Sequence, residues 1–258
     1  MKFNFEVYNC NGGNPTAILK NCESEEMFSK VADKIYDLKP EVDQTAVILE
    51  NNENGCTFQL VGGEFCGNAC LTICGYMKKE FNIENGYVIN KIIDENNINH
   101  YIKINSKCDG DLYKLSIPKE LLIKNISNTE ASNYIVEMNG ITHIIIPKSF
   151  GEDNLKYVEN EIKKLEEKKC VPDVLGIIFY DGIKIDPFIW IKRIKLLQNQ
   201  TSCLSGSVAV ACYLKDIKNI NSFNIMQPTN QSYEIEFKED FIDISGRVNW
   251  TDCGEVEI

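Results

Sequence analysis

Short runs in which apolar and polar residues alternate cover much of the chain, and they predict a protein rich in β-strands. Asn, Gly and Asp separate these runs, as expected of turns. The clearest predicted strands are TAVILE from Thr45, YVINKII from Tyr87, YKLSIP from Tyr113, IDPFIWIKRI from Ile185 and YEIEFKEDFIDISGRV from Tyr233.

Two segments have the pattern of amphipathic helices, Ser24 to Leu38 and Asp153 to Lys168. The first begins with SEEM, which resembles a capping box, and the second contains Glu and Lys pairs four residues apart. We expect both helices to dock on the surface of a sheet.

Two other segments are apolar on every side: CGNACLTICGYMKKEF, beginning at Cys66, and CLSGSVAVACYLKDI, beginning at Cys203. A helix that is hydrophobic all round must be enclosed by the protein. Because strands are so frequent, we expect a curved sheet to wrap around each of these helices.

The two apolar segments align at an offset of 203 − 66 = 137 residues. A similar correspondence joins EVYNCNGGNPTAIL from Glu6 to EMNGITHIII from Glu137. We therefore predict an internal duplication, with domains at residues 1–125 and 126–258 that meet in a polar, loop-like stretch at 122–135. The final strand, near residues 249–258, is allowed to return to the first domain.

The composition is that of a folded protein: 258 residues with 43% hydrophobic side chains suffice for real cores. The start MKFNFEVYNC lacks the apolar run of a signal peptide, and no segment approaches the roughly 18 apolar residues of a membrane span. We expect a cytoplasmic protein with no membrane partner. Eleven cysteines, an odd number without an export signal, are expected to be mostly reduced thiols.

The charge of the chain argues against nucleic acid as a partner. The net charge is −11, and basic residues around 161–169 are mixed with acidic ones. His100 and His143 are the only histidines in the sequence, which disfavours zinc-hydrolase and Ser/His/Asp chemistry.

Cys66, Cys70 and Cys74 follow one another at four-residue intervals. On a helix they would span about 12 Å, too far for one zinc ion to bind all three. Since free cysteine is among the most buried residue types, Cys70 and Cys74 are expected to be core residues. We predict no metal site.

Cys66 differs because it stands at a helix start, and Cys203 has the same position in the second half. The first helical amides have no internal partner and carry partial positive charge, which lowers a thiol pKa and attracts a carboxylate. Ser205 and Gly206 are small enough to let a ligand approach. Two such thiols in one cleft suit inversion of a carbon centre, with thiolate as base and thiol as acid, and no cofactor is needed.

These residues resemble a known family. CGNAC at Cys66 and SCLSGS at Ser202 look like the two cysteine motifs of the diaminopimelate epimerase-like family, and GGNPTAIL and QPTNQSYEIEF look like its other motifs. The resemblance implies an α+β fold of two pseudo-symmetric domains. Each is a curved, mainly antiparallel sheet wrapped around a central hydrophobic helix, with the active site in the interdomain cleft.

Within that family, GGEFCGNA from Gly62 resembles the cofactor-independent histidine racemases of opine-metallophore biosynthesis. The stretch KRIKLLQNQTSC lacks the arginine element with which diaminopimelate epimerases hold their substrate. The resemblance therefore implies a PLP-independent amino-acid racemase with histidine as the favoured small-molecule substrate. A homodimer is left open.

The resemblance also assigns roles to single residues. Cys66 and Cys203 would be the proton-transfer pair. The substrate would be bound by the remaining positions: Asn14, Glu64, Gly67, Asn68, His143, Leu204, Ser205 and Gly206. Leu204 departs from the family glycine, so its side chain could crowd the substrate. A solvated Glu64 and a purely structural His143 are the alternatives for those two residues.

Three other functions stay open from the sequence. One is epimerisation or racemisation of another amino acid, such as diaminopimelate. A second is a phenazine-biosynthesis-type isomerase, which the cysteine pair disfavours. The third is a non-catalytic amino-acid-binding or redox-sensing protein, in which the two thiols form a disulfide.

Overall fold

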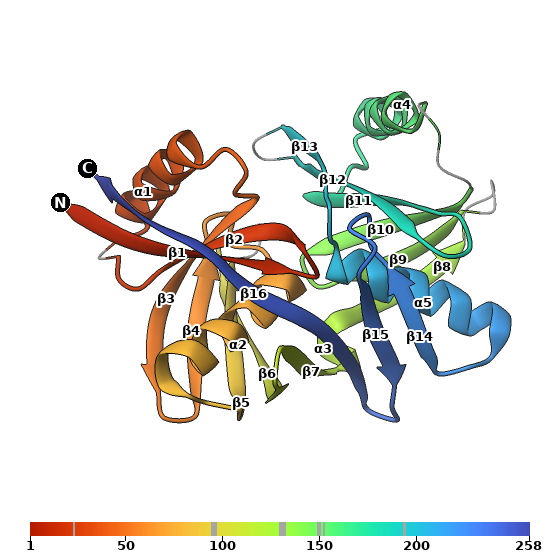
Figure 1. Cartoon of the computed structure of the whole chain (residues 1–258). Helices are drawn as coiled ribbons and strands as arrows, with labels where there is room; N and C mark the ends of the chain where they lie inside the picture. Colours follow the sequence, from red (N-terminus) through yellow and green to blue (C-terminus); the bar gives the residue numbers. More distant parts are fainter. Residues whose placement is uncertain (23, 94–96, 129–132, 149–150, 152, 193–194) are drawn as a thin grey trace. The chain divides into compact units, whose positions relative to one another are not determined.

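The computed structural model describes residues 1–258 except 23, 94–96, 129–132, 149–150, 152 and 193–194. The chain forms two compact units (Figure 1). Unit 1 comprises Met1–Ile117 and Ile242–Ile258, and unit 2 comprises Pro118–Phe241. The chain thus leaves unit 1 once and returns to it at the end. The duplication, with its boundary at 125/126, stays a prediction.

Unit 1 is built from eight described strands and two helices. In chain order they are β1 Lys2–Cys10, β2 Gly13–Leu19, α1 Glu25–Leu38, β3 Gln44–Asn52, β4 Gly55–Leu60, α2 Gly67–Phe81, β5 Asn85–Ile93, β6 Asn99–Asp109, β7 Leu112–Pro118 and β16 Phe241–Glu257. The sheet order is β1-β2-β3-β4-β5-β6-β7-β16, and β16 also pairs with β1, so the sheet closes on itself. The pairs β2–β3 and β4–β5 are parallel, and α1 and α2 make these two crossovers.

Alternation along the strands places the two helices of unit 1 on opposite faces of its sheet. Phe5 and Val7 of β1 join the core under α1, which buries Phe28, Val31, Ala32 and Ile35. Helix α2 packs against β1, β2, β4, β5 and β6 and is buried from Gly67 to Met77. The apolar character of α2 on every side therefore matches its surroundings.

Unit 2 contains a six-stranded sheet, a β-hairpin and three helices among its described residues. In chain order they are α3 Lys119–Leu122, β8 Ile123–Asn128, β9 Tyr134–Met138, β10 Ile141–Pro147, α4 Asn154–Glu167, β11 Val174–Tyr180, β12 Ile185–Ile191, β13 Leu196–Asn199, α5 Leu204–Lys218, β14 Ser222–Met226 and β15 Ser232–Phe237. The sheet order is β13-β12-β11-β10-β9-β8, and only β10 and β11 run parallel, joined by α4.

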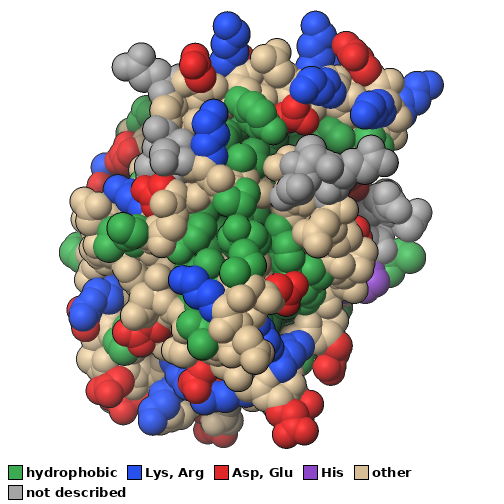
Figure 2. All heavy atoms as spheres, turned by 90° about the vertical axis from the view of Figure 1, so that its right-hand side faces the viewer, with side chains coloured by type: hydrophobic (Ala, Val, Ile, Leu, Met, Phe, Trp, Pro, Cys, Tyr) green, Lys and Arg blue, Asp and Glu red, His purple; other side chains and the backbone are tan. Residues whose placement is uncertain are grey.

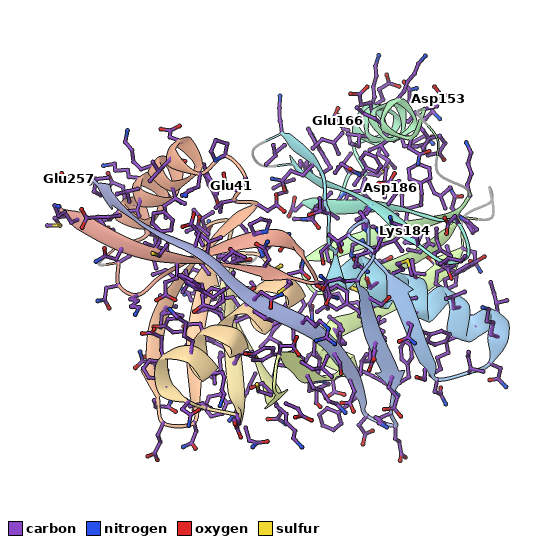
Figure 3. All side chains as sticks on the ribbon, in the orientation of Figure 1. Glu41, Asp153, Glu166, Lys184, Asp186 and Glu257 are labelled. Atoms are coloured by element: carbon purple, nitrogen blue, oxygen red, sulfur yellow. The ribbon has the colours of Figure 1, made fainter. Side chains whose placement is uncertain are left out.

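The helices of unit 2 also divide between the two faces of its sheet. Helix α4 covers a core that contains Ile146, Ile177 and Phe179. Asn154, at its first turn, donates to Asp186 of β12 at 3.2 Å; Figure 3 labels this aspartate. Helix α5 packs against β9, β10, β11, β14 and β15.

Most of the elements expected from the sequence are confirmed. The runs from Thr45, Tyr87 and Tyr113 lie in β3, β5 and β7, and the run from Tyr233 is divided between β15 and β16. The run from Ile185 forms β12 as far as Ile191, and its last two residues lie outside the described ones. Ser24 caps α1, since its Oγ accepts the Met27 amide at 3.2 Å. The expected capping box does not form, because its reciprocal bond needs Glu or Gln at position 27, where this chain has Met27.

The prediction of a loop-like stretch at 122–135 is wrong for its first part. Ile123–Asn128 forms strand β8, which pairs with β9. It is the edge strand of its sheet, so its side chains are mostly exposed and its composition is polar. Residues 129–132 of this stretch lie outside the described ones.

The surface is mixed in charge. On the face shown in Figure 2, Lys and Arg side chains lie among Asp and Glu side chains, and on α4 Lys164 pairs with Glu161 at 2.5 Å. Within the described ranges, no helix is long and apolar enough to cross a membrane. Among these same residues, no group of three or more His, Cys, Asp or Glu side chains could hold a metal ion.

Candidate active site

Cys66 is the N-cap residue of α2. Its backbone is extended, with φ −139° and ψ 115°, and its carbonyl accepts the Cys70 amide at 3.1 Å. The Cys66 N–H donates to Oδ1 of Asn90, on β5, at 3.2 Å. Cys66 is half-buried. The half-buried residue thus stands where the first amides of α2 lack intrahelical partners, as expected from the sequence.

Cys203 is the N-cap residue of α5, with φ −139° and ψ 102°. Its Sγ accepts the Gly206 amide at 3.4 Å and lies 3.7 Å from the Ser205 hydroxyl oxygen. The Cys203 N–H donates to Oε1 of Gln227 at 2.9 Å. The cysteine is only 3% exposed, so in this state its thiol is bound by the helix start itself.

The prediction that the helix start gives Cys203 a lowered pKa is wrong for this state. Burial raises the pKa of the Cys203 thiol, and the hydrogen bonds from Gly206 and Ser205 offset that effect only in part. Removing a thiolate from water costs more than these two donors return. Cys203 therefore carries its proton at neutral pH.

Cys70 and Cys74 are core residues, as expected from the sequence. They are 0% and 4% exposed, and Cys74 donates to the Cys70 carbonyl at 3.1 Å. Burial raises the pKa of Cys74 to about 12 and that of Cys70 well above its ordinary value. None of the eleven cysteines forms a disulfide in the structure, and burial keeps Cys70 and Cys74 protonated.

The residues expected to offer backbone amides lie in the first turns of the two helices. Gly67 and Asn68 begin α2 and are buried, and Leu204 begins α5 with 1% exposure. Because the Leu204 side chain is enclosed by protein, it is part of the packing of α5. Ser205 is half-buried.

Asn14 lies at the start of β2 in the left-handed region, with φ 48°, and it is fully buried. Its Oδ1 accepts Nε2 of Gln44 at 2.8 Å, and its Nδ2 lies 3.4 Å from Oδ2 of Asp43. Burial raises the pKa of Asp43 to about 6, although the bond from Asn14 acts in the opposite direction. Asp43 directly precedes strand β3 and Gln44 is its first residue, and neither stands in a motif that would identify it from the sequence.

Glu64 lies in the segment between β4 and α2 and is half-buried. A Cβ atom on Gly62 would be 1.9 Å from Oε2 of Glu64, so the carboxylate occupies the space that a side chain at position 62 would need. Burial raises the pKa of Tyr36 to about 12, and the charge of Glu64 adds to this effect. Glu64 therefore faces the protein as well as solvent.

His143, on β10, is fully buried. Its ring lies over Gly176 of β11, where a Cβ would be 2.0 Å from Nδ1. Neither ring nitrogen has a hydrogen-bond partner among the described residues. Burial lowers the pKa of His143 to about 3, so the ring is neutral.

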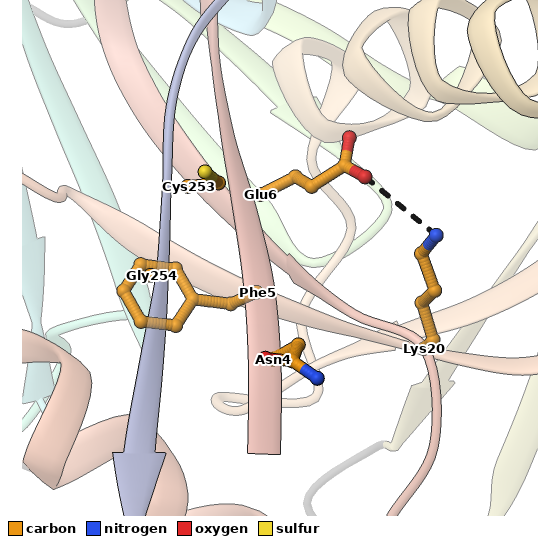
Figure 4. Close-up of a pocket in the computed structure, with 6 residues that line it drawn as sticks. All are labelled: Asn4, Phe5, Glu6, Lys20, Cys253 and Gly254. Atoms are coloured by element: carbon orange, nitrogen blue, oxygen red, sulfur yellow. Dashed lines mark ion pairs between the residues drawn. The ribbon is translucent and has the colours of Figure 1, made fainter.

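The expected site residues fall into two groups. Asn14, Glu64, Cys66, Gly67 and Asn68 belong to unit 1, and His143 and Cys203 to Gly206 belong to unit 2. A pocket in unit 1 contains none of them (Figure 4). It is lined by Asn4, Phe5, Glu6, Lys20, Cys253 and Gly254, and the Glu6–Lys20 ion pair of 3.6 Å crosses it.

A family model and two similar proteins all carry the description histidine racemase. A family model described as "Histidine racemase CntK N-terminal domain" matches residues 4–254. Two proteins described as histidine racemase, from two strains of Fusobacterium nucleatum subsp. nucleatum, are similar in sequence. One is 26% identical over 240 residues, which is 90% of this chain and 89% of that protein; the other is 28% identical over 192 residues, 72% of each.

Two solved structures are similar in fold. A phenazine biosynthesis protein of the PhzF family from Enterococcus faecalis superposes with a TM-score of 0.63 and 14% identity over 100% of both chains. A putative phenazine biosynthesis PhzC/PhzF protein from Clostridium difficile gives a TM-score of 0.62 and 12% identity, covering 99% of this chain and 100% of the other. At these identities the likeness shows the fold alone.

Proposed function

Because this chain belongs to the family described as the histidine racemase CntK N-terminal domain, we propose that it interconverts L- and D-histidine without pyridoxal phosphate. Cys66 and Cys203 are the proton-transfer pair. The observation that carries the proposal is that the family match, over residues 4–254, includes two cysteines that each cap the start of a buried helix.

The reaction needs one base and one acid. A thiolate takes the α-proton from one face of the amino acid, and the electron pair stays on Cα and spreads into the carboxylate. The other thiol then donates its proton to the opposite face, which leaves it as the thiolate for the reverse reaction. Proton and charge balance without a cofactor.

The finer part of the proposal is the architecture of the site. The two units act as pseudo-symmetric domains, each built around its helix, and they hold the substrate between them. The substrate carboxylate is bound by amides at the two helix starts: Gly67, Asn68, Leu204 and Ser205. Gly206 is small enough to let the substrate approach the backbone. Partial positive charge at these positions stabilises the carbanion as it forms.

Three side chains complete the proposed site. Asn14 contacts the substrate through its amide group, and Glu64 binds the substrate ammonium. His143 offers the substrate a neutral ring, which suits its lowered pKa and its unpartnered nitrogens.

The test is exchange of the histidine α-hydrogen in deuterated water, followed by NMR, together with racemisation followed by circular dichroism. Cys66→Ser and Cys203→Ser are each expected to reduce racemisation by about 10²- to 10⁴-fold, because each removes one acid/base group. Cys170→Ser changes an exposed cysteine and is the matched control. Full racemisation by either single active-site variant, in the presence of reductant, would exclude the two-cysteine mechanism.

A further inference from the structure

Each active-site cysteine is held by a buried carboxamide from outside its own helix. Asn90 is fully buried on β5; its Oδ1 accepts the Cys66 N–H at 3.2 Å, and its Nδ2 donates to the Lys91 carbonyl at 3.1 Å. Gln227 is fully buried just after β14, and its Oε1 accepts the Cys203 N–H at 2.9 Å. The two cysteines therefore have the same kind of partner on the same backbone atom.

The two carboxamides are equivalent by position. Asn90 and Gln227 are separated by 227 − 90 = 137 residues, the offset that separates Cys66 from Cys203. Helices α2 and α5 both have 15 residues. The matching is thus not confined to the cysteines, and it includes their hydrogen-bond partners.

The bond acts on the direction of the thiol. The N–H of an N-cap residue lies outside the helical ladder, so a buried one needs another acceptor. When its N–H is fixed and its φ is held at −139°, the direction of the Cα–Cβ bond is fixed as well. The acceptor therefore sets the direction of the Cα–Cβ bond, so that only rotation about this bond is left to place Sγ.

Gln227 is also linked, through Ser207, to the Cys203 carbonyl, which belongs to the next peptide group. Its Nε2 donates to Oγ of Ser207 at 2.8 Å, and that hydroxyl donates to the Cys203 carbonyl at 2.7 Å. A second bond from Nε2 to the Ile225 carbonyl, 2.9 Å long, fixes the amide to its own strand. Rotation of either peptide group would break one of the hydrogen bonds of this network.

We propose that Asn90 and Gln227 are a matched pair of positioning residues, each aligning one thiol for one of the two proton transfers. This inference rests on the proposed racemase function. It predicts that damage to one carboxamide impairs the proton transfer of one cysteine and leaves the other cysteine in place.

The reaction itself limits where such one-sided damage can appear. The equilibrium constant between enantiomers is 1, so kcat/KM must stay equal in the two directions for every variant. The deuterium isotope effect with α-deuterated substrate is free of this limit, since it reports how far one proton transfer limits the rate. Each cysteine is the base for one enantiomer and the acid for the other. If proton transfer at one cysteine is slowed, the isotope effect rises for the enantiomer that this cysteine deprotonates. The isotope effect falls for the other enantiomer, whose deprotonation is then no longer the slow step.

The experiment compares Gln227→Leu with Asn90→Leu. Each is expected to reduce kcat/KM by about 10- to 100-fold, the usual cost of a misplaced catalytic group. In Gln227→Leu the isotope effects for L- and D-[α-²H]histidine are expected to shift in opposite directions from wild type. In Asn90→Leu the two shifts are expected to be reversed: the enantiomer whose isotope effect rises in Gln227→Leu shows a lower one in Asn90→Leu. Gln227→Glu and Asn90→Asp keep an acceptor oxygen and are expected to return both effects toward wild type.

Two further buried carboxamides give matched controls. Gln59→Leu on β4 and Asn154→Leu on α4 remove a buried amide in each unit. They are expected to lower thermal stability while keeping wild-type isotope effects. Where a Leu variant does not fold, Gln227→Asn and Asn90→Gln change the reach of the amide by one methylene and are expected to give the same opposed shifts.

A second readout separates this inference from the racemase proposal. If the wild-type protein exchanges no histidine α-hydrogen, the proposed function fails, and alkylation by iodoacetamide then tests the positioning alone. Peptide mass spectrometry is expected to show an altered rate at Cys203 in Gln227→Leu and at Cys66 in Asn90→Leu. Folded Leu variants with wild-type isotope effects and wild-type alkylation rates would overturn the inference.

Discussion

At the scale of single residues, Asp43 is the clearest case of a group held against its ordinary chemistry. Burial raises its pKa to about 6, whereas an unfolded aspartate has a pKa of about 4. The folded state therefore binds more protons between these values, and stability falls as the pH rises from about 4 to about 6.

Asp43→Asn is expected to remove that slope and to stabilise the protein above about pH 6 by on the order of 2 kcal/mol. Urea unfolding at a series of pH values measures the effect. Asp37→Asn, on the exposed end of α1, is the control. An unchanged slope in Asp43→Asn would show that Asp43 ionises normally in the fold.

His143 is expected to act with the opposite sign. Its pKa is about 3 in the fold and about 6.5 when unfolded, so the unfolded chain binds more protons between these values. Stability then rises as the pH increases from about 3 to about 6.5. His143→Gln should abolish this contribution, and urea unfolding between about pH 4 and 7 should show a smaller loss of stability in acid. His100→Gln, at an exposed position of β6, is the control.

The residues of the proposed active site differ in how far the sequence could predict them. Cys66 and Cys203 stand in glycine-rich motifs before apolar helices. The sequence therefore shows both their position at a helix start and the reactive side chain at that position. Asn90 lies within a strand pattern and Gln227 precedes a turn, and neither residue type is unusual there. Only their bonds to the cysteine amides distinguish them, and their 137-residue separation gains meaning only from those bonds.

At the scale of elements, α2 and α5 end in the same way. Asn82 and Asn219 follow them in the left-handed region, with φ 54° and 52°. Asparagine tolerates this conformation, and alanine does not. Asn82→Ala and Asn219→Ala are each expected to destabilise the protein by about 1 kcal/mol in urea unfolding.

The glycine variants are the controls for these helix ends. Asn82→Gly and Asn219→Gly allow the positive φ, so they should remain within a few tenths of a kcal/mol of wild type. If alanine and glycine behave alike at both positions, the helix ends do not depend on the left-handed residue.

Alternating patterns predicted the strands well where one face is buried. Buried and half-buried positions alternate from Tyr113 to Ile117 of β7, and the apolar and polar residues of the sequence alternate in the same way. Strand β8 has no such pattern because its edge position exposes most of its side chains, and backbone pairing with β9 holds it. Edge strands are therefore the elements that the sequence conceals.

At the scale of the whole molecule, the pairing of the two ends of the chain is what closes the sheet of unit 1. Strand β16 runs beside β1 from Lys2↔Glu257 to Cys10↔Val248; Figure 3 labels Glu257 near the end of this strand. The sequence allowed for a returning strand near 249–258, but its register depends on contacts between residues about 250 positions apart. No local pattern contains that information.

The Phe5–Gly254 pair is a specific point in this long-range closure. The two residues are direct partners in the register, and a Cβ at position 254 would lie 2.4 Å from Cζ of Phe5. Gly254→Ala is expected to destabilise the protein by about 1 to 3 kcal/mol, because the phenyl ring must move within a packed core. Cys253→Ala, at the exposed neighbouring position, should stay within about 0.5 kcal/mol of wild type.

A double-mutant cycle tests whether the clash with the Phe5 ring causes the loss of stability in Gly254→Ala. Phe5→Leu replaces the ring that meets the new methyl group with a shorter side chain. The double variant should therefore be more stable than the sum of the single effects predicts, by at least about 0.5 kcal/mol. Urea unfolding of the four proteins measures this coupling. Strict additivity would mean that the clash is relieved elsewhere in β16 and that Gly254 is not what lets the last strand lie against the first.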